Sequence, residues 1–411
     1  GISRIFNRTR GRDDNEETLE DGKNYSHQRE SFHRCRIEFD QALENRHSSR
    51  MEDIPVEHFD VLSIDFLKIA DRSLVEKYCR IYGLSDLNYS NMNQTVLFAI
   101  SDEERFNEVF MTQVDSFAAE ENNIGTEYKT LTLMAGFHYW SSDSMKSFVL
   151  TDSEAHDVLL ELVECSPKIV SKHNNMVKAL EEYLCRNRIT YKKIESGIYQ
   201  LDFILKDELE ILLDNFDVIQ RIQSLYTTRV RPNAFGEQER VTDATLNLLE
   251  GAPTIGVIDT GVQRIAVLEP ILEQEGIDLV DKIPHPYEID LGSDSSHGTS
   301  VATLAAFGNN FYRNIDANVV DADAKIFSIK VQSGETGLVN IANIKDAIIR
   351  AHTNYGIRIF NLSMSVRGKS YNQDISTYAY ILDELAYAYD LLIFISVGNL
   401  SVDDIECMQV V

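Results

Sequence analysis

Long hydrophobic runs are absent from this 411-residue chain, in which no apolar stretch approaches the roughly 18 residues needed to cross a bilayer. Basic residues are also scarce, since 39 Lys and Arg stand against 66 Asp and Glu and give a formal net charge of −27. Such an acidic chain has no electrostatic attraction for nucleic acid or for an anionic membrane surface. We therefore expect neither of these as a partner.

Cysteines are few and irregularly spaced. The sequence has five, and no two of them form a Cys-x-x-Cys pair. An odd number of scattered cysteines suits neither a disulfide framework nor a zinc site, so we expect free thiols in a reducing compartment, the cytoplasm. No signal peptide is visible, and the sequence indicates no cofactor and no metal site. The cysteines are Cys35, Cys79, Cys165, Cys185 and Cys407.

Changes in polarity along the chain predict five regions. The first is dense in charged and amide side chains with almost no apolar periodicity, which predicts a flexible polar leader. The second alternates strand-like and helix-like patterns, as in an α+β domain, and its residues 154–165 carry helical spacing. The third has the order strand–strand–helix–strand, and the fourth is a polar linker with Gly and Pro. The expected bounds, including the fifth and last region, are 1–52, 53–184, 185–230, 231–253 and 254–411.

The fifth region alternates short apolar runs with helical patterns, which predicts an α/β fold with a parallel sheet flanked by helices. Ligands of such sheets bind at the carboxyl ends of the strands. The expected strands lie at 254–258, 325–331, 357–362 and 391–397. The expected helices lie at about 297–308, 340–354 and 375–389.

Three side chains in this region stand where such a fold places its chemistry. Asp259 leaves the apolar run 255–258, and a buried carboxylate there can hold the Nδ1 proton of a histidine. His297 opens an apolar helix, which fixes its backbone and leaves the ring free to face a cleft. Asn399 follows Gly398 at a strand end and offers an amide donor. Taken singly, each also fits an ordinary turn or surface residue.

The sequence Asp259-Thr260-Gly261 is also the motif of aspartic proteases. Those enzymes need a second matching carboxylate and an all-β fold. The nearest candidate, Asp294, is not followed by Thr-Gly, and the surrounding helical patterns do not suit that fold. The aspartic-protease alternative is therefore disfavoured.

The order of the three motifs, IGVIDTG at 255–261, HGT at 297–299 and SVGN at 396–399, resembles the subtilisin-like serine proteases, or subtilases. The resemblance implies that Asp259 and His297 are catalytic and that Asn399 belongs to the oxyanion hole. The segment NLSMS at 361–365 is similar to the edge segment with which the family binds its substrate backbone. The substrate-binding residues that this similarity implies are Ser363, Met364 and Ser365, the last standing where the family usually has Gly.

The serine of the subtilase triad has no counterpart in the sequence. The family carries it in a Gly-Thr-Ser motif several tens of residues after the oxyanion Asn, but only residues 400–411 follow Asn399 here. Because the chain also starts at Gly1, we expect it to be a fragment of a longer protein with the nucleophile beyond Val411. Residues 185–230 resemble, in order and position, the propeptide domains of subtilases, which implies a possible intramolecular inhibitor.

Two functions remain open at this point. The resemblance implies a serine endopeptidase that hydrolyses polypeptides, with these 411 residues inactive without the serine. The alternative is a pseudoprotease or regulatory binding scaffold that keeps a subtilisin-like fold. The retention of Asp259, His297 and Asn399 with their motifs favours the enzyme.

Overall fold

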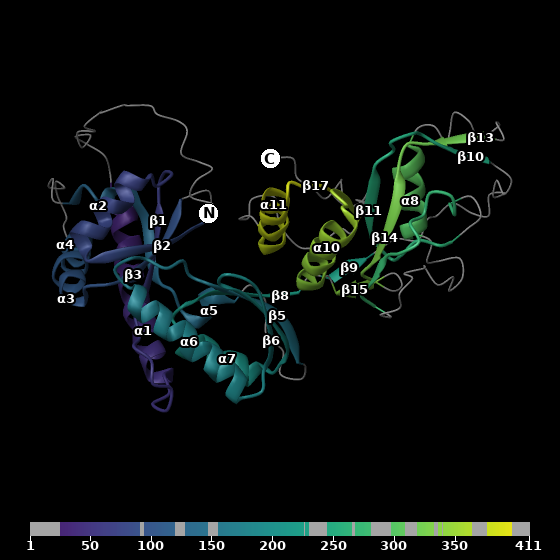
Figure 1. Cartoon of the computed structure of the whole chain (residues 1–411). Helices are drawn as coiled ribbons and strands as arrows, with labels where there is room; N and C mark the ends of the chain where they lie inside the picture. Colours follow the sequence, from purple (N-terminus) through teal and green to yellow (C-terminus); the bar gives the residue numbers. More distant parts are fainter. Residues whose placement is uncertain are drawn as a thin grey trace. The chain divides into compact units, whose positions relative to one another are not determined.

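The computed structural model describes twelve stretches of the chain and groups them into two compact units, each treated by itself below (Figure 1). One unit comprises residues 1–145, 163–182 and 210–219, and the other comprises 146–162, 183–209 and 220–411. The described residues are 25–90, 94–119, 128–146, 155–225, 227–229, 245–264, 268–280, 297–308, 319–332, 336–338, 340–363 and 376–396.

The first unit contains an antiparallel four-stranded sheet in the order β2-β3-β1-β4. One face of this sheet carries a core of aromatic side chains from strands and helices, among them Tyr78, Phe110 and Phe137. The strands are β1 (Val61–Phe66), β2 (Leu84–Ser90), β3 (Thr95–Ile100) and β4 (Met134–Tyr139). The helical segments are α2 (Arg72–Tyr82), α3 (Glu103–Arg105), the π-helical η3 (Phe106–Met111), α4 (Thr112–Ala119), the 3-10 turn η5 (Leu131–Leu133) and α5 (Ser142–Met145).

The prediction of a flexible leader over residues 1–52 is wrong for most of its second half. Helix α1 (Ser26–Ser49) occupies this stretch, and Phe32 and Phe39 are fully buried in the aromatic core. These two residues are seven apart, so they lie on one face of the helix, two turns from each other. The other core contacts of the helix come from smaller or partly buried residues, Cys35, Ala42 and Leu43, and the pattern is hard to see among many charged neighbours.

A second antiparallel sheet has the order β6-β7-β5-β8. Its strands are β5 (His156–Leu162), β6 (Thr190–Glu195), β7 (Ile198–Ile204) and β8 (Ile219–Ser224). In the chain, helix α6 (Val170–Arg186) stands between β5 and β6, and α7 (Lys206–Asn215) stands between β7 and β8. Residues 154–165 were expected to be helical, but they contain the internal strand β5. Val158, Leu159 and Leu160 are all fully buried there, and a short run with both faces buried does not distinguish strand from helix by its periodicity.

The second unit contains a parallel five-stranded sheet in the order β12-β14-β11-β16-β17. Its strands are β11 (Thr254–Asp259), β12 (Ile277–Asp278), β14 (Lys325–Lys330), β16 (Ile359–Leu362) and β17 (Leu392–Ile395). Its helices are α8 (His297–Phe307), α10 (Ile341–Tyr355) and α11 (Thr377–Tyr389). This architecture confirms the predicted fold class.

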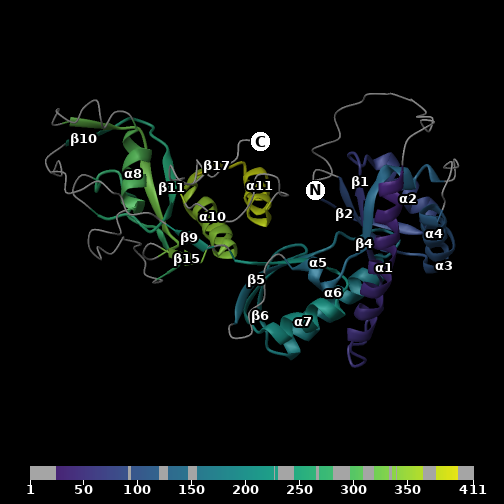
Figure 2. The ribbon, with the colours of Figure 1, turned by 180° about the vertical axis from the view of Figure 1, so that it is seen from behind.

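Helices cover both faces of the parallel sheet (Figures 1 and 2). On β11, Val257 packs in a cluster with Ala302 and Ala306 of α8, while its neighbour Ile258 packs in a different cluster with α10 and α11. Because consecutive strand residues point to opposite faces, apolar residues in a row are what a sheet with two covered faces requires.

Two short strand pairs complete the described architecture. Strand β10 (Thr245–Leu248) runs parallel to β13 (Val319–Ala322), and β9 (Thr227–Arg229) runs antiparallel to β15 (Thr336–Leu338). Within the described ranges, no helix combines the length and apolarity needed to span a membrane.

Candidate active site

Asp259 ends the central strand of the parallel sheet. Strand β11 pairs with β14 through Asp259 itself and with β16 as far as the preceding residue, Ile258, so the end of the strand is fixed. The Asp259 carbonyl accepts the Val331 amide at 2.9 Å, and its fully buried carboxylate accepts the Thr260 amide at 2.7 Å. The carboxylate is therefore fixed at the carboxyl end of the sheet, the edge where parallel α/β folds bind ligands.

His297 is the first residue of α8 and faces this carboxylate. Its Nδ1 lies 2.9 Å from Oδ1 and 3.0 Å from Oδ2 of Asp259, and 15% of its side chain is exposed. The carboxylate accepts the Nδ1 proton and thus selects the tautomer in which Nε2 carries a lone pair and can act as a base. The prediction that these two side chains lie within hydrogen-bond reach is confirmed.

Two threonines join the Asp259 turn to the start of α8. The Thr260 hydroxyl accepts the Gly298 amide at 3.0 Å, and the Thr299 hydroxyl accepts the Gln263 amide at 2.9 Å. The sequence pattern alone does not predict these two hydrogen bonds. The signal that could have found them is the Thr in each motif, directly after Asp259 and two residues after His297.

Gly298 is required by the close approach of these two segments. A Cβ built on it would lie 2.1 Å from the Gly261 carbonyl oxygen, far inside van der Waals contact with backbone that has little freedom to move. Gly261 itself has a φ of +100°, a conformation that favours glycine. A side chain at position 298 would therefore push His297 away from Asp259.

The remaining predicted site residues are only partly within the described structure. Ser363 directly follows β16, and its hydroxyl accepts the Asn361 side-chain amide at 2.7 Å. Since β16 is parallel to β11, Ser363 lies at the same carboxyl edge as Asp259. Met364, Ser365 and Asn399 lie outside the described residues.

A buried lysine stands next to Asp259 in the sheet. Lys330 of β14 is paired in register with Asp259 on one side and with Asp278 of β12 on the other. All three residues are buried, with exposures of 0%, 2% and 8% for Asp259, Lys330 and Asp278. The sequence pattern of a parallel strand gave no sign of this row, because strand pairing is needed to bring the three together.

No metal-binding group of three or more His, Cys, Asp or Glu side chains occurs among the residues that the structure describes. The hydrogen-bonded pair itself offers proton transfer at His297, supported by the Asp259 carboxylate.

Three solved structures illustrate the similarity of this chain to known proteases. The epidermin leader peptide processing serine protease from Staphylococcus aureus matches at 15% identity and a TM-score of 0.36, over 61% of this chain and 62% of its own. A mutant of that protease matches at 15% identity and a TM-score of 0.35, over 58% of each chain. Fervidolysin from Fervidobacterium pennivorans, described as a keratinolytic enzyme related to subtilisin, matches at 15% identity and a TM-score of 0.36. That match covers 62% of this chain and 42% of fervidolysin.

This chain thus spans between about two fifths and three fifths of the length of those structures, and no curated protein sequence matches it. The family model of the subtilases, peptidase S8, matches residues 251–409. That range includes the Asp259–His297 pair and every strand of the parallel sheet. The chain therefore contains a domain of the subtilase family over residues 251–409.

Proposed function

We propose that the protein is a serine endopeptidase that hydrolyses polypeptides through an Asp-His-Ser triad. Asp259 and His297 are two members of the triad, and the serine is contributed by sequence that follows Val411. The observation that carries the proposal is the hydrogen bond between the buried Asp259 carboxylate and His297 Nδ1 at a strand end. A scaffold that only binds partners has no need of a histidine held in this tautomer, so the geometry favours the enzyme over a pseudoprotease.

The reaction follows from the positions of these groups. His297 Nε2 takes the hydroxyl proton of the serine as that oxygen attacks the scissile carbonyl, and then passes the proton to the leaving amine. Asp259 stabilises the imidazolium formed in between, without itself becoming protonated. In this proposal the Asn399 amide donates to the oxyanion, and residues 363–365 bind the substrate backbone. The described thiols Cys35, Cys79, Cys165 and Cys185 are free, which supports a reducing compartment such as the cytoplasm.

Labelling with a fluorophosphonate probe tests the proposal directly. We expect no labelling of residues 1–411 alone, because the activated serine lies outside them. The longer protein should label at one serine, and a His297→Gln change in it should abolish labelling because no base remains to activate that serine. Specific labelling of the 411-residue chain, or undiminished labelling of the His297→Gln variant, would refute the proposal.

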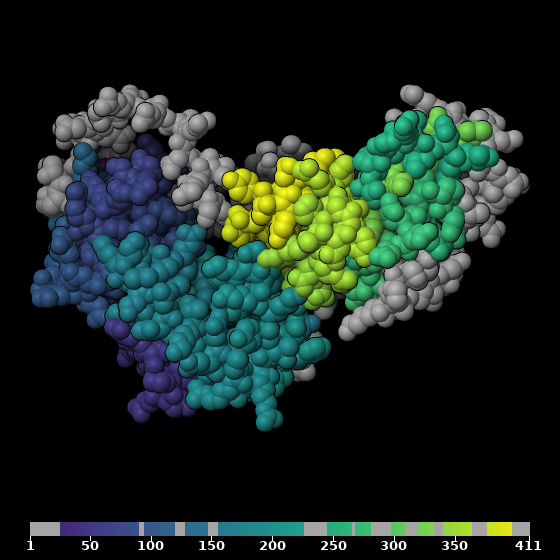
Figure 3. Space-filling model, in the orientation of Figure 1, coloured from purple at the N-terminus to yellow at the C-terminus, as the bar shows by residue number. Residues whose placement is uncertain are grey.

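We further propose that the propeptide-like unit predicted at 185–230 begins earlier, at β5, because β5 lies in the same sheet as β6, β7 and β8. Residues 156–229, called the propeptide-like unit below, then inhibit the protease domain in the same chain. The apolar residues Leu159, Ile194 and Ile198 of its sheet share a core cluster with α10 and α11. Lys345 of α10 donates to the Ile194 carbonyl at 2.5 Å and pairs with Glu195. Figure 3 shows the lime and yellow side chains of α10 and α11 as one continuous surface.

The chain leaving the propeptide-like unit supports the same function. Strand β9 follows β8 directly and adds to β15 of the protease domain as an antiparallel strand, with Thr228 opposite Gly337. The two strands form a two-stranded sheet of their own, and such backbone pairing is a common way for proteins to bind an extended peptide. The backbone of β15 is therefore hydrogen-bonded to another segment of the same chain, β9.

A charge reversal at the interface tests the inhibition. In the longer protein, Lys345→Glu should raise the initial rate of peptide hydrolysis about three- to tenfold, because it sets two carboxylates against each other where a pair now forms. The effect is moderate because the Lys345 and Glu195 side chains are 16% and 34% exposed. The swap Lys345→Glu with Glu195→Lys should return the rate toward the starting value. Equal rates in all three proteins would contradict the inhibitory role.

A further inference from the structure

The two antiparallel sheets of this chain have the same topology. The first is built in the order β1, α2, β2, β3, α3–α4, β4 and has the strand order β2-β3-β1-β4. The second is built in the order β5, α6, β6, β7, α7, β8 and has the strand order β6-β7-β5-β8. Adding four to each strand number in the first sheet gives the strand order of the second sheet. Both are the βαββαβ arrangement known as the split βαβ fold.

The pairings agree as well as the order. Strands β2 and β3 form an antiparallel hairpin, as do β6 and β7. The first strand of each set pairs antiparallel with the third, β1 with β3 and β5 with β7. The first set adds one element, helix α1, which packs along β4 and α4. The N-terminal domain, residues 26–145, is thus a second copy of the propeptide-like topology with a helix appended.

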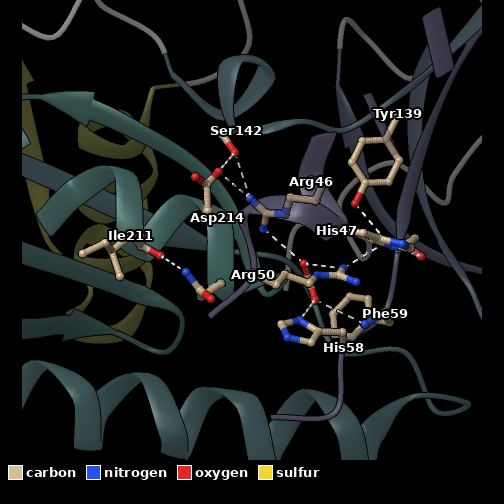
Figure 4. A network of polar contacts seen from close by, with 12 residues as sticks. Arg46, His47, Arg50, His58, Phe59, Tyr139, Ser142, Ile211 and Asp214 are labelled. Carbon is tan, nitrogen blue, oxygen red and sulfur yellow. Dashed lines mark hydrogen bonds and ion pairs between the residues drawn. The ribbon is translucent and has the colours of Figure 1, made fainter. Parts of the chain in front are cut away.

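The end of the appended helix contacts the turn between α7 and β8. Asp217 in this turn accepts Arg46 Nη2 at 3.1 Å and Arg50 Nη2 at 3.2 Å (Figure 4). The segment before β1 adds His58 Nδ1 at 2.7 Å and the Phe59 amide at 3.3 Å. Four donors from the N-terminal domain therefore converge on one carboxylate, and the Arg46 and Asp217 side chains are only 2% and 3% exposed.

Neighbours of Asp217 in the same turn are held too. Asp214 pairs with Arg46 Nη1 at 3.5 Å and accepts the Ser142 hydroxyl. The Asn215 side-chain oxygen accepts the Met51 amide at 2.7 Å. The acidic turn, residues 214–217, is thus bonded at three of its four positions to the N-terminal domain.

The charges in this network compensate one another. Burial alone would raise the pKa of the Asp217 carboxyl, but the His58 hydrogen bond and the Arg46 and Arg50 charges outweigh it and lower that pKa below its usual 3.8. Arg50 also pairs with Asp60 at 3.0 Å, which in turn accepts the Tyr139 hydroxyl at 2.9 Å and His47 at 3.0 Å. Removing one member of so buried a network leaves an uncompensated charge, which is strongly destabilising.

We propose that the N-terminal domain is a second propeptide-like module whose partner is the propeptide-like unit. By docking on the acidic turn through Arg46 and Arg50, it holds that unit in its folded state. Stability of the propeptide-like unit is then set by a contact that belongs to neither the catalytic residues nor the surface of α10 and α11. The inference concerns coupled folding and does not depend on peptidase activity.

Hydrogen–deuterium exchange on residues 1–411 tests the coupling. In Asp217→Asn, amides of β5, β6 and β7 as well as of 206–224 should exchange roughly a hundredfold faster or more, while β11 and β14 keep their rates as internal references. Lys172→Met is the matched control. It removes the solvent-exposed Lys172–Glu57 pair, at 3.0 Å with 40% and 62% of the side chains exposed, and should change the same amides less than about threefold.

An Arg46→Met change should also speed exchange of these amides. In the double variant with Asp217→Asn, the increase in exchange rate should be smaller than the product of the two single increases, because both changes remove the same contact. If Asp217→Asn does not fold, His58→Gln replaces it, because it keeps both arginine pairs and should still speed exchange about tenfold. Faster exchange confined to residues 214–218, or fully multiplicative effects in the double variant, would overturn the proposal.

Discussion

An Asp259→Asn variant of the longer protein is expected to hydrolyse peptides about 10⁴-fold more slowly than the unaltered enzyme, the loss seen when a Ser-His-Asp protease loses this carboxylate to an amide. The geometry gives the reason. His297 Nδ1 now donates to both oxygens of Asp259, at 2.9 and 3.0 Å. An asparagine amide at either position donates in turn, favours the opposite tautomer and leaves Nε2 protonated, so His297 no longer accepts the serine proton.

The measurement is kcat with a peptide substrate, together with the KM, which should change little because Asp259 lies behind the histidine. Asp321→Asn serves as the matched control. Asp321 is an aspartate of β13, outside the five-stranded sheet, where its carboxylate accepts the Asn247 side-chain amide at 2.8 Å. Its turnover should stay within about threefold of the unaltered enzyme, on the scale of a substitution outside the reacting groups. A similar turnover in Asp259→Asn and Asp321→Asn would remove Asp259 from the catalytic mechanism.

A Phe39→Ala variant is expected to lower the free energy of unfolding of the N-terminal domain by about 3–5 kcal/mol, the range for truncating a buried phenylalanine. Phe39 is 1% exposed, and its ring lies 5.9, 6.1 and 5.6 Å from the ring centroids of Phe106, Phe137 and Tyr139. Alanine at this position leaves a cavity between α1 and the sheet. The loss would be measured by urea unfolding of the 411-residue chain, followed by near-ultraviolet circular dichroism.

Ile37→Ala is the control for this variant, because Ile37 lies two residues away on the same helix and is 55% exposed. Its effect should stay within about 0.5 kcal/mol. Equal stabilities of the Phe39→Ala and Ile37→Ala variants would mean that helix α1 contributes nothing to the core, as the flexible leader predicted from the sequence would have it.

The parallel sheet was predictable from sequence because its signals are local. Each strand is a short apolar run bounded by a helix with its own periodicity, and the Asp259 and His297 motifs mark an element end on their own. The pairing of β5 with β7 and β8, and of β1 with β3 and β4, joins segments far apart in the sequence, and nothing local specifies it. For the same reason the Asp217 network could not be predicted, because its partners Arg46 and Asp217 are 171 residues apart in the chain.

Two other features also depend on contacts between distant segments and could not be predicted. They are the in-register set of Asp259, Lys330 and Asp278, and the hydrogen bonds of the Thr260 and Thr299 hydroxyls. Lys330 takes its place only through strand register, and Thr260 meets Gly298 only because α8 packs across the end of β11. The prediction for helix α1 was wrong for a different reason. Its buried face carries only two aromatic residues, Phe32 and Phe39, and its other core contacts come from smaller or partly buried residues among charged neighbours. The local sequence pattern thus predicts secondary-structure elements and motifs well, but it does not predict contacts between segments that are distant in the sequence.

The 171 residues that separate Arg46 from Asp217 in the sequence also cause a delay between the synthesis of the two residues. A ribosome adds about 5–20 residues per second, so roughly 10 to 35 seconds pass between the synthesis of these two side chains. Throughout that interval Arg46 has neither Asp214 nor Asp217 to pair with. The N-terminal domain is therefore completed only by a turn that is synthesised much later. Until that turn emerges, the nascent N-terminal domain carries an arginine whose buried position has no counter-charge, and the two propeptide-like modules reach their final state in the same step.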